Sequence, residues 1–178
     1  MRYVTSFISA VLFTVVQCVV VVLVVVATPI SQIDSTRTKG CHTFWGYKAD
    51  CTKTKYTQQG KAAFFNCAMR RNNMNGGAAL AIISIVTTLV TLLFCVFMLL
   101  RVSCPVLLPF IFACVSVITT LISWACVAGA YSIKMCDWKW SDGVLGSLYK
   151  YGPGFWVMIA ATCLQFVNAV GLGIISFV

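Results

Sequence analysis

The sequence predicts an all-α membrane protein: a four-helix transmembrane bundle with a small, disulfide-stapled, β-containing ectodomain formed by two loops. Composition is the first observation behind this fold class, because 60% of the 178 residues are hydrophobic and only 10% are charged, with a mean hydropathy of +0.93. A soluble domain carries about 25% charged residues to cover its surface. The second observation is that the apolar residues form four runs, each longer than the roughly 18 residues that indicate a membrane helix.

The four runs cover residues 4–27, 76–100, 106–131 and 154–178, and none of them contains Asp, Glu, Lys, Arg or His. A helix of about 25 residues is about 37 Å long, whereas the hydrocarbon core of a bilayer is ~30 Å thick. We therefore expect tilted helices. The first run exceeds the 7 to about 15 apolar residues of a cleavable signal, so we interpret it as a retained helix.

The polar residues inside these runs are few. Gln17, Gln165 and Asn168 are expected to form hydrogen bonds between helices, which explains their presence adequately. Because no carboxylate, lysine or histidine lies within the runs, a proton-coupled pump is not favoured.

Four spans place both termini on one side of the membrane, together with the short link 101–105. The other side carries two larger loops, 28–75 and 132–153, and we interpret residues 1–178 as a single membrane domain. Recognition is expected in these loops, because binding residues concentrate in loops held by a rigid scaffold. The first loop has eight basic and two acidic residues, a net charge of +6, and the second loop has a net charge of +1.

Charges and cysteines give conflicting indications of orientation. Eleven of the thirteen basic residues lie on the loop side, which the positive-inside rule would make cytoplasmic. Cys41, Cys51, Cys67 and Cys136 lie in the same two loops. An even number of cysteines in a small ectodomain is typical of disulfides in an oxidising compartment, which favours loops that face outside.

The four loop cysteines allow three disulfide pairings. We favour Cys41 with Cys51, which leaves Cys67 to connect the first loop to the second through Cys136. A disulfide that closes so short a loop contributes roughly 2 to 4 kcal/mol to stability. The alternative is a zinc site that uses His42 and three thiolates, although the segment lacks the short CxxC spacing of such sites.

The first loop is expected to contain a short antiparallel sheet. The segment 52–57, TKTKYT, alternates as a strand does, and Gly46 is expected to permit a turn. Trp45 and Tyr47 have two interpretations: they pack within the ectodomain or at the membrane interface, or they contact a ligand. Residue types that favour strands stand at Thr43, Phe44, Trp45 and Tyr47.

The basic residues of the first loop are candidate contacts for an anionic partner. Residues 61–71 have helical spacing and are expected to lead into the second helix, with their basic side chains in water or facing lipid headgroups. The candidate contacts are Lys53, Lys55, Lys61, Arg70 and Arg71.

Signatures of catalysis are absent from the sequence. It contains no HExxH, GxSxG or P-loop motif and no pair of carboxylates in the membrane. A four-helix thiol oxidoreductase is the least favoured alternative, because it would need a reactive pair, usually CxxC. We therefore expect a protein that is not an enzyme, with no cofactor, no metal and no nucleic-acid partner.

The segment from the first loop cysteine to the second, CHTFWGYKADC, resembles the signature of the amastins, four-span surface proteins of trypanosomatid parasites. His42 departs from that signature, which usually has an apolar residue there. Further segments are similar to family landmarks: ATPI at 27–30, AALAIIS at 78–84, SWACVAGAY at 123–131 and YGPGF at 151–155. The signature is matched at Cys41, Thr43, Phe44, Trp45, Gly46, Lys48, Asp50 and Cys51.

The resemblance implies a multi-pass protein of the plasma membrane, with cytoplasmic termini and both large loops outside, against the charge rule. We expect its cationic ectodomain to serve surface interaction: contact with a host cell or vacuole, lateral association, or membrane integrity. Candidate partners are the lipid bilayer, a second copy in a homo-oligomer, and anionic glycans, lipid headgroups or host membrane components. The alternative function is a pore or facilitator for ions or small solutes, formed by oligomerisation.

The plan is also similar to that of claudins, whose first loop carries a Trp-Gly element and a cysteine pair. Here Trp45 and Gly46 lie between the cysteines rather than before them. Amastins are described as glycoproteins, but no asparagine of this chain stands in an N-x-S/T sequon. The sequence leaves O-linked sugar on the first loop open.

Overall fold

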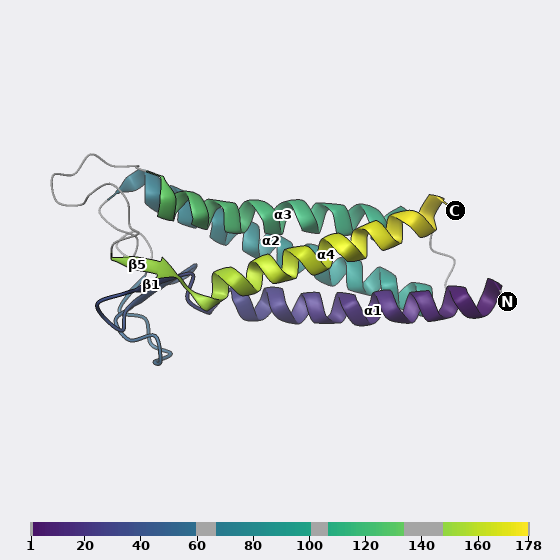
Figure 1. The fold of residues 1–178 in the computed structure, drawn as a ribbon, viewed down its shortest axis with the longest axis horizontal. Coiled ribbons are helices and arrows are strands. Elements are labelled where there is room, and N and C mark those ends of the chain that lie inside the picture. Colours follow the sequence, from purple (N-terminus) through teal and green to yellow (C-terminus); the bar gives the residue numbers. More distant parts are fainter. Residues whose placement is uncertain (1, 60–66, 101–106, 134–147, 178) are drawn as a thin grey trace.

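The computed structural model describes residues 2–59, 67–100, 107–133 and 148–177. In this part of the chain, four long helices form a bundle, with a small sheet at one end and both ends of the chain at the other (Figure 1). All four are long and apolar enough to cross a membrane. The four-helix bundle predicted from the sequence is confirmed. Its helices are α1 (Arg2–Ala27), α2 (Ala68–Leu99), α3 (Leu107–Ser132) and α4 (Pro153–Phe177).

The side chains of the bundle are distributed as expected for a protein in lipid. In α1, Gln17 is fully buried, whereas large apolar side chains at helical spacing are exposed. Soluble proteins show the opposite arrangement, because their polar groups face water. Buried polar residues are instead typical of helices that turn their apolar surface to lipid. The exposed apolar residues of α1 include Ile8, Leu12, Val15, Val19 and Val22.

Helix α2 begins earlier than the apolar run that predicts it. It starts at Ala68, whereas the run starts at Gly76. The first two turns have the sequence AMRRNNMN, which is compatible with a helix but too polar for a scan of apolar runs to include. Of the helical entry expected over residues 61–71, the part from Ala68 is helical, and residues 60–66 lie outside the described part.

The sheet contains five short antiparallel strands in the order β4–β3–β2–β1–β5. The first four come from the first loop and β5 comes from the second, so the two loops share one sheet (Figure 1). The predicted β-containing domain formed by both loops is confirmed. The strands are β1 (Ile33–Ser35), β2 (Cys41–Thr43), β3 (Gly46–Lys48), β4 (Gln58–Gln59) and β5 (Tyr149–Tyr151). We call residues 28–59 and 148–152 the sheet region.

The segment 52–57, expected to contribute a strand, forms turns and bends instead. Thr52 donates both its backbone N–H (3.0 Å) and its hydroxyl (2.7 Å) to the carboxylate of Asp50. Such an Asx turn gives the backbone local partners in place of a neighbouring strand. The alternation of threonine and lysine was therefore a misleading signal, because these side chains are exposed on a turn.

One face of the sheet packs on the bundle. Tyr47, His42, Ile33 and Tyr151 lie in one row across β3, β2, β1 and β5. Ile33 is fully buried in a hydrophobic cluster that also includes Met74 of α2, and Tyr47 and Tyr151 pack against this cluster. The sheet and the adjacent end of the bundle therefore share one hydrophobic core.

Two glycines in the segment YGPGF allow α4 to begin close to the chain that follows α1. The N–H of Gly152 donates to the carbonyl of Gln32 and that of Gly154 donates to the carbonyl of Ser31, both at 2.9 Å. A Cβ at Gly154 would lie 2.8 Å from the Ser31 carbonyl oxygen, and one at Gly152 would lie 2.8 Å from the Ser31 carbonyl carbon. Since both neighbours are backbone atoms, no side chain fits at either position.

Candidate functional site

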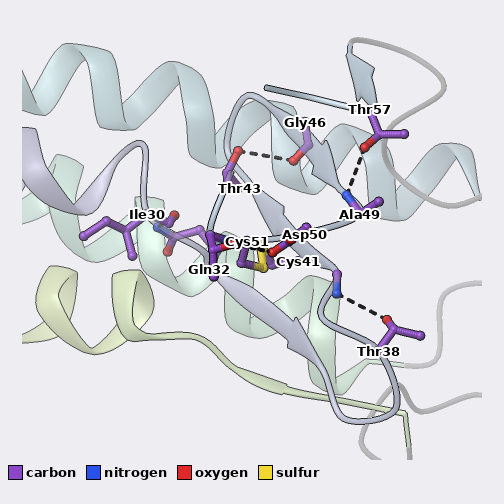
Figure 2. Close-up of a disulfide and its surroundings, with 12 residues drawn as sticks. Ile30, Gln32, Thr38, Cys41, Thr43, Gly46, Ala49, Asp50, Cys51 and Thr57 are labelled. Carbon is purple, nitrogen blue, oxygen red and sulfur yellow. Dashed lines mark hydrogen bonds between the residues drawn. A yellow bond between two sulfur atoms is a disulfide. The ribbon is translucent and has the colours of Figure 1, made fainter. Parts of the chain in front are cut away.

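The signature segment forms a tight hairpin between β2 and β3 (Figure 2). Thr43 pairs with Gly46, so Phe44 and Trp45 form the turn rather than part of a strand. The Thr43 hydroxyl donates to the Gly46 carbonyl at 3.2 Å and accepts the Trp45 N–H at 3.1 Å. Gly46 has a φ of 156°, a conformation that favours glycine. Thr43 and Gly46 therefore determine the shape of the turn.

A disulfide closes the base of this hairpin. It joins Cys41, the first residue of β2, to Cys51, with their Cα atoms 5.8 Å apart (Figure 2). The Cys51 N–H donates to the Lys39 carbonyl at 3.0 Å, which holds the returning chain beside β2. The predicted pairing of Cys41 with Cys51 is confirmed. Cys67 is also disulfide-bonded, and Cys136, its predicted partner, lies outside the described residues.

The disulfide excludes the zinc alternative. With their sulfurs joined to each other, Cys41 and Cys51 cannot serve as thiolate ligands. His42 is buried against aromatic rings, with its centroid 4.9 Å from that of Tyr47 and 5.7 Å from that of Tyr149. His42, the residue that departs from the signature, is therefore part of the core. The same surroundings affect Tyr149: its burial, and then the neighbouring Tyr47, raise the pKa of its hydroxyl.

Phe44 connects the hairpin to the bundle. Its side chain is 2% exposed and belongs to the same buried cluster as Met74 and Val127. A Cβ at Gly77 of α2 would lie 3.1 Å from Phe44 Cε1 and 3.1 Å from the carbonyl oxygen of Ser123 in α3. The Ser123 hydroxyl in turn donates to the Gly77 carbonyl at 2.9 Å. Gly77 thus leaves room for the ring at the contact between α2 and α3.

The two aromatic residues with open interpretations have different surroundings. Tyr47 is half-buried and packs against the core, and a Cβ at Gly40 would lie 3.0 Å from its ring carbon Cζ. Trp45 is 37% exposed at the tip of the turn. Tyr47 therefore has a structural role, and Trp45 is the signature aromatic that is open to lipid or to a partner.

Lys48 and Asp50 make local contacts. The Lys48 ammonium lies 4.7 Å from the centroid of the Tyr56 ring, within the range of a cation–π interaction. The hydrogen bonds from the hydroxyl and the N–H of Thr52, and then the nearby Lys53, lower the pKa of Asp50. Both signature residues thus stabilise the chain around the disulfide.

A cleft of about 550 Å³ lies where the sheet meets the ends of α1 and α4. Four of its lining residues, Lys48, Cys41, Asp34 and Lys150, are direct neighbours across β3, β2, β1 and β5. Residues 29–31, which follow α1, also line it. Its volume is in the range of small-molecule sites. Sequence reasoning offered no signal for this cleft, because Lys150 of β5 is distant in the chain from the other charged residues that line it.

Comparison with a protein-family model identifies the family of the chain. The model of the family described as Amastin surface glycoprotein matches residues 18–172, which is most of the chain. The chain belongs to the amastin family. No curated protein and no solved structure gives a significant match. This amastin is therefore a multi-pass membrane protein of the cell surface, and its matched region includes both loops and the cleft.

The charged side chains in the sheet region of this amastin are unequally exposed. Asp34 and Asp50, its two acidic residues, are both half-buried. Asp34 lies directly opposite Lys150 in the pairing of β1 with β5. Within the described sheet region, every exposed charged side chain is therefore basic. These side chains are Arg37, Lys39, Lys53, Lys55 and Lys150.

The five candidate basic contacts of the amastin do not share one environment. Arg70 is only 7% exposed, because it lies on the buried face of α2. The expectation that Arg70 faces water or headgroups is therefore wrong, and we leave it out of the binding surface proposed below. Lys53 and Lys55 are exposed, Arg71 is half-buried, and Lys61 lies outside the described residues.

Proposed function

We propose that this amastin presents a cationic ectodomain at the outer surface of the plasma membrane, where it binds anionic partners such as acidic glycans or lipid headgroups. The observation that carries the proposal is the unequal exposure of charge in the sheet region. Its exposed charged side chains are all basic, and its two acidic residues are half-buried. Clustered charge of one sign raises the local concentration and the association rate of ligands of opposite charge.

The acidic residues are placed where they weaken this surface least. Asp34 faces the cleft and has Lys150 opposite it on β5. Asp50 accepts two hydrogen bonds from Thr52. Lys53 and Lys55 extend from the neighbouring exposed turn, which the Cys41–Cys51 disulfide holds at its base. We therefore assign the first contact with an anionic partner to these two lysines.

Charge reversal in Lys53→Glu/Lys55→Glu is expected to weaken binding to heparin or to anionic liposomes by roughly 30-fold or more. The estimate follows because a basic residue close to an anionic surface contributes about 1 kcal/mol and two are removed. The measurement is an affinity titration of the full chain at low and high salt. Binding by the wild type is expected to fall as salt rises, since salt screens exposed charges.

The matched control is Lys53→Arg/Lys55→Arg, which keeps both charges at the same positions. This variant is expected to bind as the wild type does. Binding that is independent of salt and equal in all three proteins would contradict the electrostatic proposal.

The outward orientation rests on the Cys41–Cys51 disulfide, because such bonds persist in oxidising compartments. A membrane-impermeant maleimide applied to intact cells is expected to label Cys41 and Cys51 only after reduction. Labelled residues are identified by mass spectrometry of the isolated protein. Labelling that requires permeabilisation but no reductant would instead support the positive-inside orientation.

A further inference from the structure

The interior of the bundle contains a layer of polar side chains near the middle of its four spans. Gln17 of α1, Thr88 of α2, Thr120 of α3 and Gln165 of α4 are all fully buried. Asn168 Nδ2 donates to Gln17 Oε1 at 2.7 Å, and Gln17 Nε2 donates to the Thr88 carbonyl at 3.1 Å. Gln17 and Asn168 therefore form the hydrogen bonds between helices that the sequence predicts, and these connect α1, α2 and α4, whereas the bond predicted for Gln165 is not among them.

Four polar atoms of this layer have no hydrogen-bond partner within the described residues. They are both amide atoms of Gln165, Asn168 Oδ1 and Ser116 Oγ. Gln165 and Ser116 are 0% exposed and Asn168 is 2% exposed. Exchanging the nitrogen and oxygen of the Gln165 amide does not help, because both ends lack a partner. Lipid tails cannot satisfy such groups, and leaving them unpaired is unfavourable.

The packing of α3 on α4 places Ser116 and Gln165 at the same level. The two helices run in opposite directions, and Ala113 of α3 clusters with Ala169 of α4 (Figure 1). Ser116 on α3 and Gln165 on α4 each lie one helical turn from this contact, on the side toward the sheet. Asn168 follows Gln165 by three residues and lies on the same side of α4. The unpartnered atoms of these three residues therefore lie at one level of the buried interior of the bundle.

We propose that these atoms form a binding site for water at the middle of the bundle. Water both donates and accepts hydrogen bonds, and a buried water makes about three of them. The site offers this combination, with one amide NH₂ as donor, two carbonyl oxygens as acceptors and a hydroxyl that does both. A cation is a poorer occupant, because the layer contains no carboxylate and the NH₂ group would repel it.

Bound water extends the polar network across the bundle. It connects Ser116 of α3 to Gln165 and Asn168 of α4, and through Asn168 to Gln17 of α1. All four helices then take part in one set of hydrogen bonds, since Gln17 already binds α2 through Thr88. This inference concerns the membrane interior and does not depend on the proposed surface function.

The test is solution NMR of the full chain in lipid nanodiscs, with ¹⁵N-labelled glutamine. The Gln165 side-chain NH₂ signal, assigned by its absence in Gln165→Met, is expected to show a cross-peak with water. Ser116→Ala removes one of roughly three partners of the water and is expected to weaken that cross-peak about twofold or more.

Thr162→Val is the matched control, because the Thr162 hydroxyl already donates to the Met158 carbonyl at 2.9 Å, within its own helix. This variant is expected to leave the cross-peak unchanged. A wild-type Gln165 NH₂ signal with contacts to protein or lipid but none to water would overturn the proposal. An equal loss of the cross-peak in Thr162→Val and Ser116→Ala would overturn the assignment of Ser116 to the site.

Discussion

Replacement of Phe44 by alanine is expected to lower the free energy of unfolding by about 3–5 kcal/mol, the usual cost of removing a buried phenylalanine. The ring is 2% exposed and fills the space over Gly77 where α2 contacts α3. Without it, the hairpin loses its main apolar contact with the bundle. The measurement is unfolding of the full chain by increasing SDS in mixed micelles, followed by circular dichroism and by tryptophan fluorescence.

Trp45→Ala is the matched control, since it removes an aromatic side chain from the other position of the same turn. Trp45 is 37% exposed, so its removal is expected to cost less than about 1 kcal/mol. If Trp45→Ala proved as destabilising as Phe44→Ala, the hairpin would not be anchored in the manner described.

Removal of the signature disulfide in Cys41→Ala/Cys51→Ala is expected to lower the free energy of unfolding by about 2–4 kcal/mol. The bond closes a loop with a sequence separation of 10, so the unfolded chain gains freedom when it is absent. It also holds the chain after β3 against Lys39. The same SDS titration, performed without reductant, measures the effect while the disulfide of Cys67 stays intact.

Two cysteines that are not part of a disulfide provide the control. Cys18 and Cys163 are free and exposed on the bundle, so Cys18→Ala/Cys163→Ala removes the same atoms without breaking a disulfide. Its unfolding is expected to differ little from that of the wild type. Equal destabilisation by the two double variants would show that the Cys41–Cys51 bond contributes nothing to the stability of the chain.

The amastin signature of this chain has a mainly structural role. Thr43 and Gly46 determine the shape of the turn, and the Phe44 side chain packs the turn against the bundle. The disulfide and the Asx turn at Asp50 hold the returning chain. Trp45, at the tip, is the signature aromatic that is exposed. Recognition is therefore expected at the exposed residues that this hairpin supports.

The helices could be predicted from the sequence because hydropathy is a local property. A run of about 20 apolar residues has only one stable conformation in lipid, a helix that satisfies its own hydrogen bonds. The same reasoning failed at the polar start of α2, and so misplaced Arg70, because burial there depends on parts of the chain that are distant in sequence. It also failed at residues 52–57, where side-chain hydrogen bonds of Asp50 outweigh an alternating pattern.

By itself, the sequence determined the four spans and the location of the charge in two loops, and it favoured the pairing of Cys41 with Cys51, because all of these depend on residues close together in the chain. Only the tertiary structure decided which distant residues meet. The pairing of β5 with β1 places Lys150 opposite Asp34 and completes the cleft. The packing of α3 on α4 gathers Ser116 and Gln165 into one polar layer. Such contacts follow from how whole elements bury their faces, which no local pattern specifies.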